Sequence, residues 1–443
     1  MIKQHLKTIF KNSLWSFGDQ TVGLVIGFII SPLISRLLPP TDRGIFTLVF
    51  LVPGMITQFI VLGIPSSNIF FYASKKIDDL TLDKVNFYFG SVLSIIGVII
   101  NLIIAFSLKS TFYNEVQFNY ILLSTISIPI SIYTSFLMST LGAKQLFKKT
   151  AFISTSINIL NFALTLAVFF CYREALFLLI LLTIFISVIN LIILIVITKP
   201  QIIHNNSSIT SYLKIAFRYG VPAHLSNVVG YLSYRSDQYL VSYLLGNASL
   251  GLYSVAVGLT EKLWMFSSTI SGVAFPKLSE LFQDINAQNK ISLLLARWIF
   301  IASFIGAVIM AILFPFYIRY AHGANYIDSI PLFLIMLPGV VMWGTGRIFA
   351  NSLASLGKTK PNLYIAITTF ILNFSLNLIL LPVIGVKGAS IATLIAYTSD
   401  TLLKAYFYCK LTNQRLSDLF KLLPEEKQFL KSLNSSNLMS SHL

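Results

Sequence analysis

Long apolar runs, separated by short polar segments, restrict the fold of this chain more than any other feature of its sequence. An α-helix needs ~20 mostly apolar residues to cross the hydrocarbon core of a bilayer. Runs of that length fall at about 13–38, 43–64, 85–108, 117–141, 150–170, 174–198, 219–245, 249–275, 292–317, 329–355, 361–382 and 387–409. We therefore expect an all-α integral membrane protein with about twelve transmembrane helices.

The composition excludes several other classes of protein. Of the 443 residues, 56% are hydrophobic and 11% are charged, and the mean hydropathy is +0.79. These values do not fit a soluble domain, a disulfide-stapled secreted domain or a disordered chain. An outer-membrane barrel is also disfavoured, because its strands alternate between apolar and polar residues. The two cysteines, Cys171 and Cys409, fall at opposite membrane faces, so we expect no disulfide between them.

The net charge of +16 follows from membrane topology and needs no nucleic-acid partner. With the N-terminus in the cytoplasm, 22 of the 32 Lys and Arg residues fall in the two tails and the even-numbered loops. Only 5 fall in the outer loops, and the other 5 lie inside the expected helices. Because basic residues concentrate on the cytoplasmic side, this bias predicts that both the N-terminus and the C-terminus are cytoplasmic.

An internal repeat divides the chain into two halves. Residues 23–50 match 230–257 at an offset of 207, which pairs Gly44 with Gly251. The tetrapeptide Ile-Leu-Asn-Phe occurs at 159–162 and again at 371–374, at an offset of 212. The repeat predicts two six-helix bundles, 1–198 and 212–409, joined by a cytoplasmic linker at 199–211 and followed by a cytoplasmic tail at 410–443. An offset of six helices keeps the orientation, so the repeats are parallel, an arrangement typical of carriers.

Charged residues inside the expected helices are costly in a bilayer and are therefore the first candidates for function. The acidic ones are Asp19, Asp237, Glu261 and Asp400, and the basic ones are Arg36, Arg235, Lys262, Arg347 and Lys404. Arg235, Lys262 and Arg347 all fall in the second half. Together they would form a cationic site for an anionic substrate, and an arginine fork suits phosphate oxygens. The alternative is that nearby acids neutralise these cations in structural ion pairs.

A polar stripe runs along the expected helix 219–245 and predicts a surface that faces water or substrate. At 100° per residue, one arc of about 100° contains His224, Asn227, Tyr231, Tyr234, Arg235, Gln238 and Ser242. We predict that Asn227, Tyr231, Tyr234 and Gln238 line a cavity, together with Asn351, which shares a helix face with Trp343 and Arg347. Hydrogen bonds between helices of one bundle would explain the same stripe.

Two further acids are candidates for coupling transport to an ion gradient. Asp19 in the first helix and Glu261 in the eighth could each carry a proton, since a buried carboxyl takes up a proton near neutral pH. The alternatives are a capping role for Asp19 and an ion pair with Lys262 for Glu261. Asp400 and Lys404 have the i, i+4 spacing of a structural ion pair.

No sequence motif indicates catalysis. The chain has no P-loop, no Gly-x-Ser-x-Gly, no His-Glu-x-x-His and no Cys/His cluster with metal spacing. We therefore expect no enzymatic activity, no metal and no cofactor.

Residues 217–281 resemble the Wzx-type polysaccharide-biosynthesis flippases of the multidrug/oligosaccharidyl-lipid/polysaccharide exporter superfamily. The segments that carry the resemblance are 219–222 (YGVP), 234–238 (YRSDQ), the outer turn 245–254 and 275–278 (FPKL). Residues 38–46 (LPPTDRGIF) resemble the equivalent outer turn of the first half.

The resemblance implies a MATE-like exporter fold in the bacterial inner membrane and translocation of an undecaprenyl-diphosphate-linked oligosaccharide by alternating access. The diphosphate would contact Arg235, Arg347 and Lys262. The chain would act as a monomer, with a polysaccharide polymerase and chain-length machinery as further partners. A cation-coupled multidrug antiporter of the same fold is the alternative, and a membrane glycosyltransferase or polymerase is disfavoured by the short outer loops.

Overall fold

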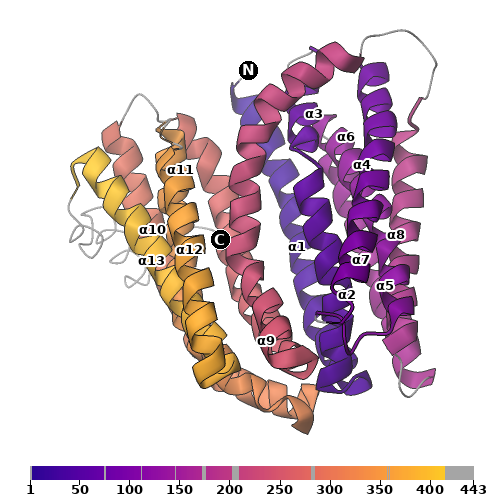
Figure 1. Ribbon diagram of the computed structural model, residues 1–443. Coiled ribbons are helices and arrows are strands. Elements are labelled where there is room, and N and C mark those ends of the chain that lie inside the picture. Colours follow the sequence, from indigo (N-terminus) through magenta and orange to yellow (C-terminus); the bar gives the residue numbers. More distant parts are fainter. Residues whose placement is uncertain are drawn as a thin grey trace, which may run out of the picture. The chain divides into compact units, whose positions relative to one another are not determined.

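The computed structural model describes residues 2–73, 76–110, 112–144, 146–171, 176–201, 209–280, 285–356, 358 and 360–414, and the regular elements in this part of the chain are helices joined by turns. Figure 1 shows α1 to α8 lying side by side as a bundle. The helices are α1 (Ile2–Leu37), α2 (Pro40–Ile60), α3 (Ile64–Ala73), α4 (Asp79–Ser107), α5 (Phe118–Thr125), α6 (Ser127–Ala143), α7 (Phe147–Cys171), α8 (Leu176–Thr198), α9 (Ile209–Glu280), α10 (Ile285–Tyr317), the π-turn η1 (Ile318–His322), the 3₁₀ turn η2 (Ala324–Tyr326), α11 (Ser329–Ser355), α12 (Lys360–Ile384) and α13 (Val386–Thr412).

Ten helical segments in the described residues are long and apolar enough to cross a membrane. This confirms a multi-pass, all-α membrane protein, whereas the count of twelve and the orientation stay predictions. The expected helix 117–141 is divided into α5 and α6 at Ile126. Pro129 explains this break, because it has no N–H to donate to the carbonyl of Thr125 and its ring crowds that carbonyl.

The long helix α9 folds back on itself at Gly246. This residue has φ 81° and ψ 176°, a conformation that glycine adopts far more readily than other residues. The hydroxyl of Tyr253 lies 2.5 Å from Oδ2 of Asp237. Sixteen residues of straight helix would separate two positions by ~24 Å. The two arms, 209–245 and 247–280, are therefore the expected seventh and eighth helices, joined by a tight turn.

The chain divides into two compact units. One contains Met1–Thr260, Ala311–Met336 and Phe370–Thr393, and the other contains Glu261–Met310, Leu337–Thr369 and Leu394–Leu443. The first has a core of Leu137, Leu141, Ile153 and Leu194 from α6, α7 and α8. The second has a core on α10, α11 and α13 that includes Ile299, Phe349 and Tyr408. The predicted bundle boundaries stay predictions, and 202–208 of the linker and 415–443 of the tail lie outside the described residues.

Large apolar side chains cover the outside of several helices. Phe170 is 77% exposed, Val383 75% and Phe152 72%. In water such exposure would be unfavourable, but lipid tails solvate these side chains. The exposed apolar surface therefore agrees with a chain that spans a bilayer.

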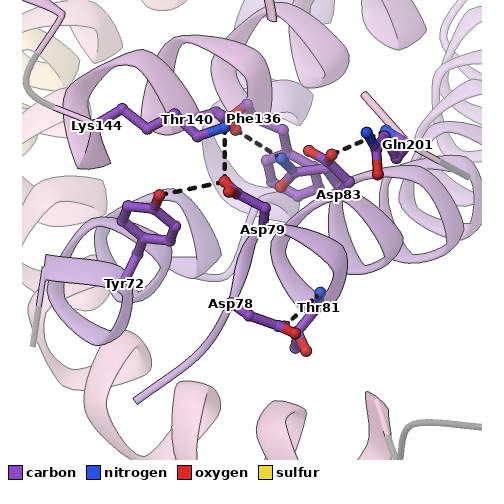
Figure 2. A network of polar contacts seen from close by, with 10 residues as sticks. Tyr72, Asp78, Asp79, Thr81, Asp83, Phe136, Thr140, Lys144 and Gln201 are labelled. Atoms are coloured by element: carbon purple, nitrogen blue, oxygen red, sulfur yellow. Dashed lines mark hydrogen bonds and ion pairs between the residues drawn. The ribbon is translucent and has the colours of Figure 1, made fainter. Parts of the chain in front are cut away.

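A polar network joins α3, α4 and α6 at the end of the first unit where the charge bias places the cytoplasm. Figure 2 shows Tyr72 and Lys144 converging on Asp79, with Lys144 Nζ 2.6 Å and the Tyr72 hydroxyl 3.2 Å from Oδ1. One turn along α4, Asp83 accepts the backbone N–H of Gln201 at 2.9 Å. The side chain of Asp78 caps α4 by accepting the backbone N–H of Thr81, and the bonds from Thr81 lower the pKa of Asp78. The start of the linker is thus held against α4.

Two glycines form a reciprocal contact between the outer turns of the two halves. A Cβ added at Gly44 would lie 1.7 Å from the carbonyl oxygen of Asn247, and one added at Gly251 would lie 1.9 Å from the carbonyl oxygen of Pro40. Gly44 and Gly251 are equivalent in the repeat, as are Pro40 and Asn247, because both pairs are 207 residues apart. In each half, the repeated glycine packs against the equivalent carbonyl of the other half. Such a reciprocal contact is the pattern expected for two elements related by a twofold axis.

We expect Gly44→Ala and Gly251→Ala to destabilise the protein, because the new methyl group would overlap a backbone carbonyl that cannot rotate away. Overpacking of this kind costs at least about 1–3 kcal/mol. Gly258→Ala in α9 is the matched control, since a Cβ there meets nothing within 4 Å and alanine favours a helix by about 1 kcal/mol. Thermal unfolding of the detergent-solubilised protein measures the effect. Equal midpoints for all three variants would contradict the close contact.

Candidate functional site

Arg347 lies over a pair of contacting indole rings in the second unit. Its Cζ is 5.4 Å from the centre of the Trp264 ring and 5.7 Å from that of Trp343. The two indole centres are 4.4 Å apart, and Trp343 also stacks on Tyr397 at 5.1 Å with an interplanar angle of 16°. Three helices, α9, α11 and α13, contribute to this aromatic stack. The face of an aromatic ring attracts a cation, so the stack holds the guanidinium half-buried within an apolar helix.

Hydrogen bonds between helices surround the stack in the same unit. The amide of Asn351 donates to the carbonyl oxygen of Ser271 at 2.8 Å and to its hydroxyl at 2.7 Å. The hydroxyl oxygens of Ser267 and Ser303 lie 3.1 Å apart, within hydrogen-bonding distance. The amide of Asn351 is therefore engaged in joining α11 to α9. Its cavity role stays a prediction.

Glu261 and Lys262 lie next to each other on the second arm of α9, and both are half-buried. Lys262 therefore belongs to the same unit as Arg347, whereas Arg235 belongs to the other unit. Whether the three predicted cations share one site stays a prediction.

The first arm of α9 packs along α2 through part of its polar stripe. His224 Nε2 is 3.0 Å from the carbonyl oxygen of Phe59, and the hydroxyl of Tyr239 donates to the carbonyl oxygen of Leu51 at 2.8 Å. The bond of His224 joins helices of the two predicted bundles, so it is not the hydrogen bonding within one bundle that was the alternative, and the role of the stripe stays a prediction.

The predicted cavity residues of this arm differ widely in exposure. Asn227 is exposed, Tyr231, Tyr234 and Arg235 are half-buried, and Gln238 is 3% exposed. Tyr231 and Tyr234 meet edge to face with their ring centres 6.2 Å apart. Their role as a cavity wall stays a prediction.

Asp237 is the most enclosed of the acids singled out in the sequence, with 3% of its surface exposed. Its carboxylate accepts the hydroxyl of Tyr253 at 2.5 Å, the hydroxyl of Thr393 at 3.3 Å and the backbone N–H of Gln238 at 2.7 Å. The sequence marked Asp237 as an in-span acid and as a possible partner of the cations. Its two hydroxyl donors come from the fold-back of α9 and from α13, so no local pattern could have revealed them.

The two remaining acids have simpler surroundings. Asp400 and Lys404 form the expected i, i+4 ion pair, with Oδ2 and Nζ 2.6 Å apart and both side chains largely buried. Asp19 is half-buried in α1 and accepts the hydroxyl of Thr155 on α7 at 3.1 Å. A role for Asp19 or Glu261 in ion coupling stays a prediction.

A further polar cluster lies at the first outer turn, and sequence reasoning missed it. Arg43, assigned to an outer loop by the charge count, lies in α2 and is 9% exposed. It donates to the carbonyl oxygen of Ser31 at 3.0 Å and to the hydroxyl of Ser35 at 2.5 Å, and its Cζ is 5.7 Å from the ring centre of Tyr326. His322, which sequence reasoning left outside the spans, ends an apolar segment and is 1% exposed. The segment 38–46 was the available signal, because Arg43 falls within it.

The described residues contain no group of three or more His, Cys, Asp or Glu side chains that could hold a metal ion. The polar groups described above are instead hydroxyls, amides, cations and single carboxylates inside apolar helices. Such groups can bind and release a polar headgroup or an ion, which is the chemistry of a carrier.

Comparison with known proteins identifies the family. The family model described as polysaccharide biosynthesis protein matches residues 33–331, and the capsular polysaccharide biosynthesis protein CapF of Staphylococcus aureus is 24% identical over 46% of this chain and 52% of its own length. The chain thus spans about half the length of that relative. A Shigella flexneri protein whose name describes an O-antigen transporter is 23% identical over 91% of this chain and 98% of its own length.

Solved structures define the fold. The lipid II flippase MurJ in an inward closed conformation has a TM-score of 0.74 at 18% identity, covering 96% of this chain and 93% of its own. A multidrug resistance MATE family transporter of the MOP superfamily, in an outward-facing conformation, has a TM-score of 0.66 at 14% identity, covering 92% and 96%. The names of the Shigella flexneri relative and of these two solved structures describe transporters and a flippase. The chain therefore belongs to the polysaccharide biosynthesis protein family and has the fold of the multidrug/oligosaccharidyl-lipid/polysaccharide exporter superfamily.

Proposed function

We propose that this protein is a flippase that moves an undecaprenyl-diphosphate-linked oligosaccharide, the repeat unit of an O antigen, capsule or exopolysaccharide, across the bacterial inner membrane by alternating access. The observation that carries the proposal is Arg347, a half-buried cation that lies over the paired rings of Trp264 and Trp343 inside an apolar helix. A charged side chain within a membrane span is costly, and such residues mark functional sites.

The chemistry of the stack matches a lipid diphosphate. The guanidinium of an arginine forms a planar fork that binds phosphate oxygens two at a time. Arg235 and Lys262 would add positive charge, and Asn227, Tyr231, Tyr234, Gln238 and Asn351 would contact the sugars or line the path.

An ion gradient would drive the cycle, since the chain has no P-loop for ATP. Asp19 and Glu261 remain the proposed carriers of a coupling proton. The enclosed carboxylate of Asp237, bonded to two hydroxyls, adds a third candidate. The protein would act as a monomer and would pass its substrate to a polysaccharide polymerase and chain-length machinery.

Cation-coupled drug antiport by the same fold is the second candidate function. The buried acid Asp237 favours it, because a membrane acid can bind a coupling ion or a cationic drug. The two functions have different deletion phenotypes. Loss of a flippase removes surface polysaccharide, whereas loss of a drug antiporter increases sensitivity to cationic drugs.

We expect Arg235→Ala and Arg347→Ala to abolish export, because each removes a cation proposed to hold the diphosphate. The measurement is surface polysaccharide in a strain that lacks its own oligosaccharide flippase, with all variants at equal expression. Arg319→Ala is the matched control, since Arg319 is exposed on η1. If both Ala variants leave surface polysaccharide normal, the cationic-site proposal is wrong.

We also expect the aromatic stack to contribute to headgroup binding. Farnesyl diphosphate is a soluble probe, and its dissociation constant for the purified protein can be measured by calorimetry. Removing a partner from a buried cation–π contact costs about 1–2 kcal/mol, so Trp343→Leu should weaken binding about 5- to 30-fold. Arg347→Lys should also weaken it, because lysine cannot bind two oxygens as a fork.

Trp298→Leu on α10 is the control for tryptophan removal, and farnesol, which lacks the diphosphate, is the control for the headgroup. Equal affinity for farnesol and farnesyl diphosphate, or equal weakening by Trp298→Leu and Trp343→Leu, would count against a diphosphate site at this stack.

A further inference from the structure

His322 is held in an environment that fits only a neutral imidazole. It ends the π-turn η1, a geometry that is often found at functional positions. Its Nδ1 lies 2.6 Å from the hydroxyl oxygen of Ser35, and its buried Nε2 has no hydrogen-bond partner among the described residues. A proton on each nitrogen would therefore leave one N–H buried without an acceptor, which is costly in an apolar surrounding.

The bonds of Ser35 explain how the neutral form is accommodated. The Ser35 hydroxyl oxygen accepts from Nη1 of Arg43 at 2.5 Å, and its hydrogen can be donated to the carbonyl oxygen of Ser31 at 3.1 Å or to Nδ1 of His322. The neutral tautomer with its proton on Nδ1 fits this pattern, because Nδ1 then donates to Ser35 and the buried Nε2 carries no proton. A doubly protonated imidazole would instead place a second positive charge next to the guanidinium of Arg43, with one oxygen between them.

The arginines around His322 add to this effect, whereas Asp42 contributes a negative charge to the region. Arg36 on α1 donates to the backbone carbonyls of Ala321 and Tyr320, which adds a further positive charge. Burial raises the pKa of Tyr326 to about 12, although Arg43 opposes the rise, so its hydroxyl stays protonated. The groups that face this region are Arg36 from α1, Asp42 and Arg43 from α2, Tyr317 from α10 and Tyr326 from η2.

The same cluster holds the first outer turn in place. The hydroxyl of Tyr326 donates to the carbonyl oxygen of Leu38 at 2.7 Å, immediately before Pro39 and Pro40. The carbonyl of Pro40 is the group against which Gly251 of the other half packs. Loss of the bonds around His322 and Arg43 would therefore release the turn that makes the reciprocal glycine contact.

We propose that His322 is a proton-binding site that controls the closure of the outer turns, so that a proton taken up from the outer side breaks the Arg43–Ser35–His322 cluster and lets the turns part. The idea rests on the proposed alternating access and on the orientation predicted from the charge bias. In this proposal, the proton that binds His322 opens the carrier on its outer side. It is a different proton from the one that the acids would carry to couple transport to an ion gradient.

The size of the effect follows from linkage. An imidazole exposed to water titrates near pH 6.5. If the closed turns admit only the neutral form, lowering the pH from about 8 to about 5.5 raises the ratio of parted to closed molecules about tenfold. The sign is fixed, because only the parted state takes up the proton, so acid favours parting.

Spin labels measure this ratio without any substrate. Thr41 and Ala248 are exposed, equivalent positions of the two outer turns, and cysteines can be placed there after Cys171→Ser and Cys409→Ser. The protein is measured in lipid nanodiscs. Dipolar broadening of the electron paramagnetic resonance spectrum reports molecules in which the two labels are close together, and pulsed dipolar spectroscopy reports molecules in which they are far apart. We expect the ratio of parted to closed molecules in the otherwise unchanged protein to rise about tenfold on acidification.

His322→Asn should abolish that response and keep the turns together, because the amide occupies the position of Nδ1 but takes up no proton. If that variant does not fold, Arg43→Gln provides a second test, since removing the neighbouring charge should reduce the response well below tenfold. The matched control is His224→Gln, which changes the histidine on α9 and should leave the response intact.

An unchanged parted fraction between the two pH values overturns the proposal, as does a full response in His322→Asn or a loss of response in His224→Gln. Because no substrate is present, these outcomes are independent of export. A protein that responds to pH but does not bind farnesyl diphosphate would contradict the proposed function and leave the proton site standing.

Discussion

The absence of water in the hydrocarbon core is the constraint on which the rest of this structure depends. Backbone N–H and C=O groups there must be bonded within their own helix, so the described chain is helical. Polar side chains then have only other helices to bond. The contacts of Asn351 with Ser271, of Tyr253 with Asp237 and of Arg43 with Ser35 are all of this kind, and they determine which helices pack together.

The fold was predictable from run length and hydropathy because a membrane span has a narrow range of lengths. The site was predictable only along single helices. Periodicity correctly placed Trp343 one turn from Arg347, which the structure shows as a cation–π contact. It could not place Trp264, which comes from another helix, because the angle and depth at which two helices pack depend on side chains from the whole bundle.

Small errors in helix ends hid the cluster at the first outer turn. The charge count assigned Arg43 to the outer loop, at the very start of the expected second helix, but α2 begins three residues earlier at Pro40 and Arg43 is buried within it. The expected ninth helix ends at 317, but helical turns continue to His322. Apolar runs locate the middle of a span well and its ends poorly, since caps and π-turns leave little trace in hydropathy. Both ends carry ionisable residues, so the error fell on chemically important positions.

The kink at Gly246 makes the two outer turns unequal despite their matching contacts. The position equivalent to Gly246 in the first half is Pro39, which has φ −63° and ψ 163°. The two residues thus share a similar ψ but have φ of opposite sign, and neither residue type could replace the other: proline cannot reach φ 81°, and glycine would loosen the first turn. If the halves arose by duplication, this position has since become specialised. Chimeras that exchange the halves should therefore be joined away from it.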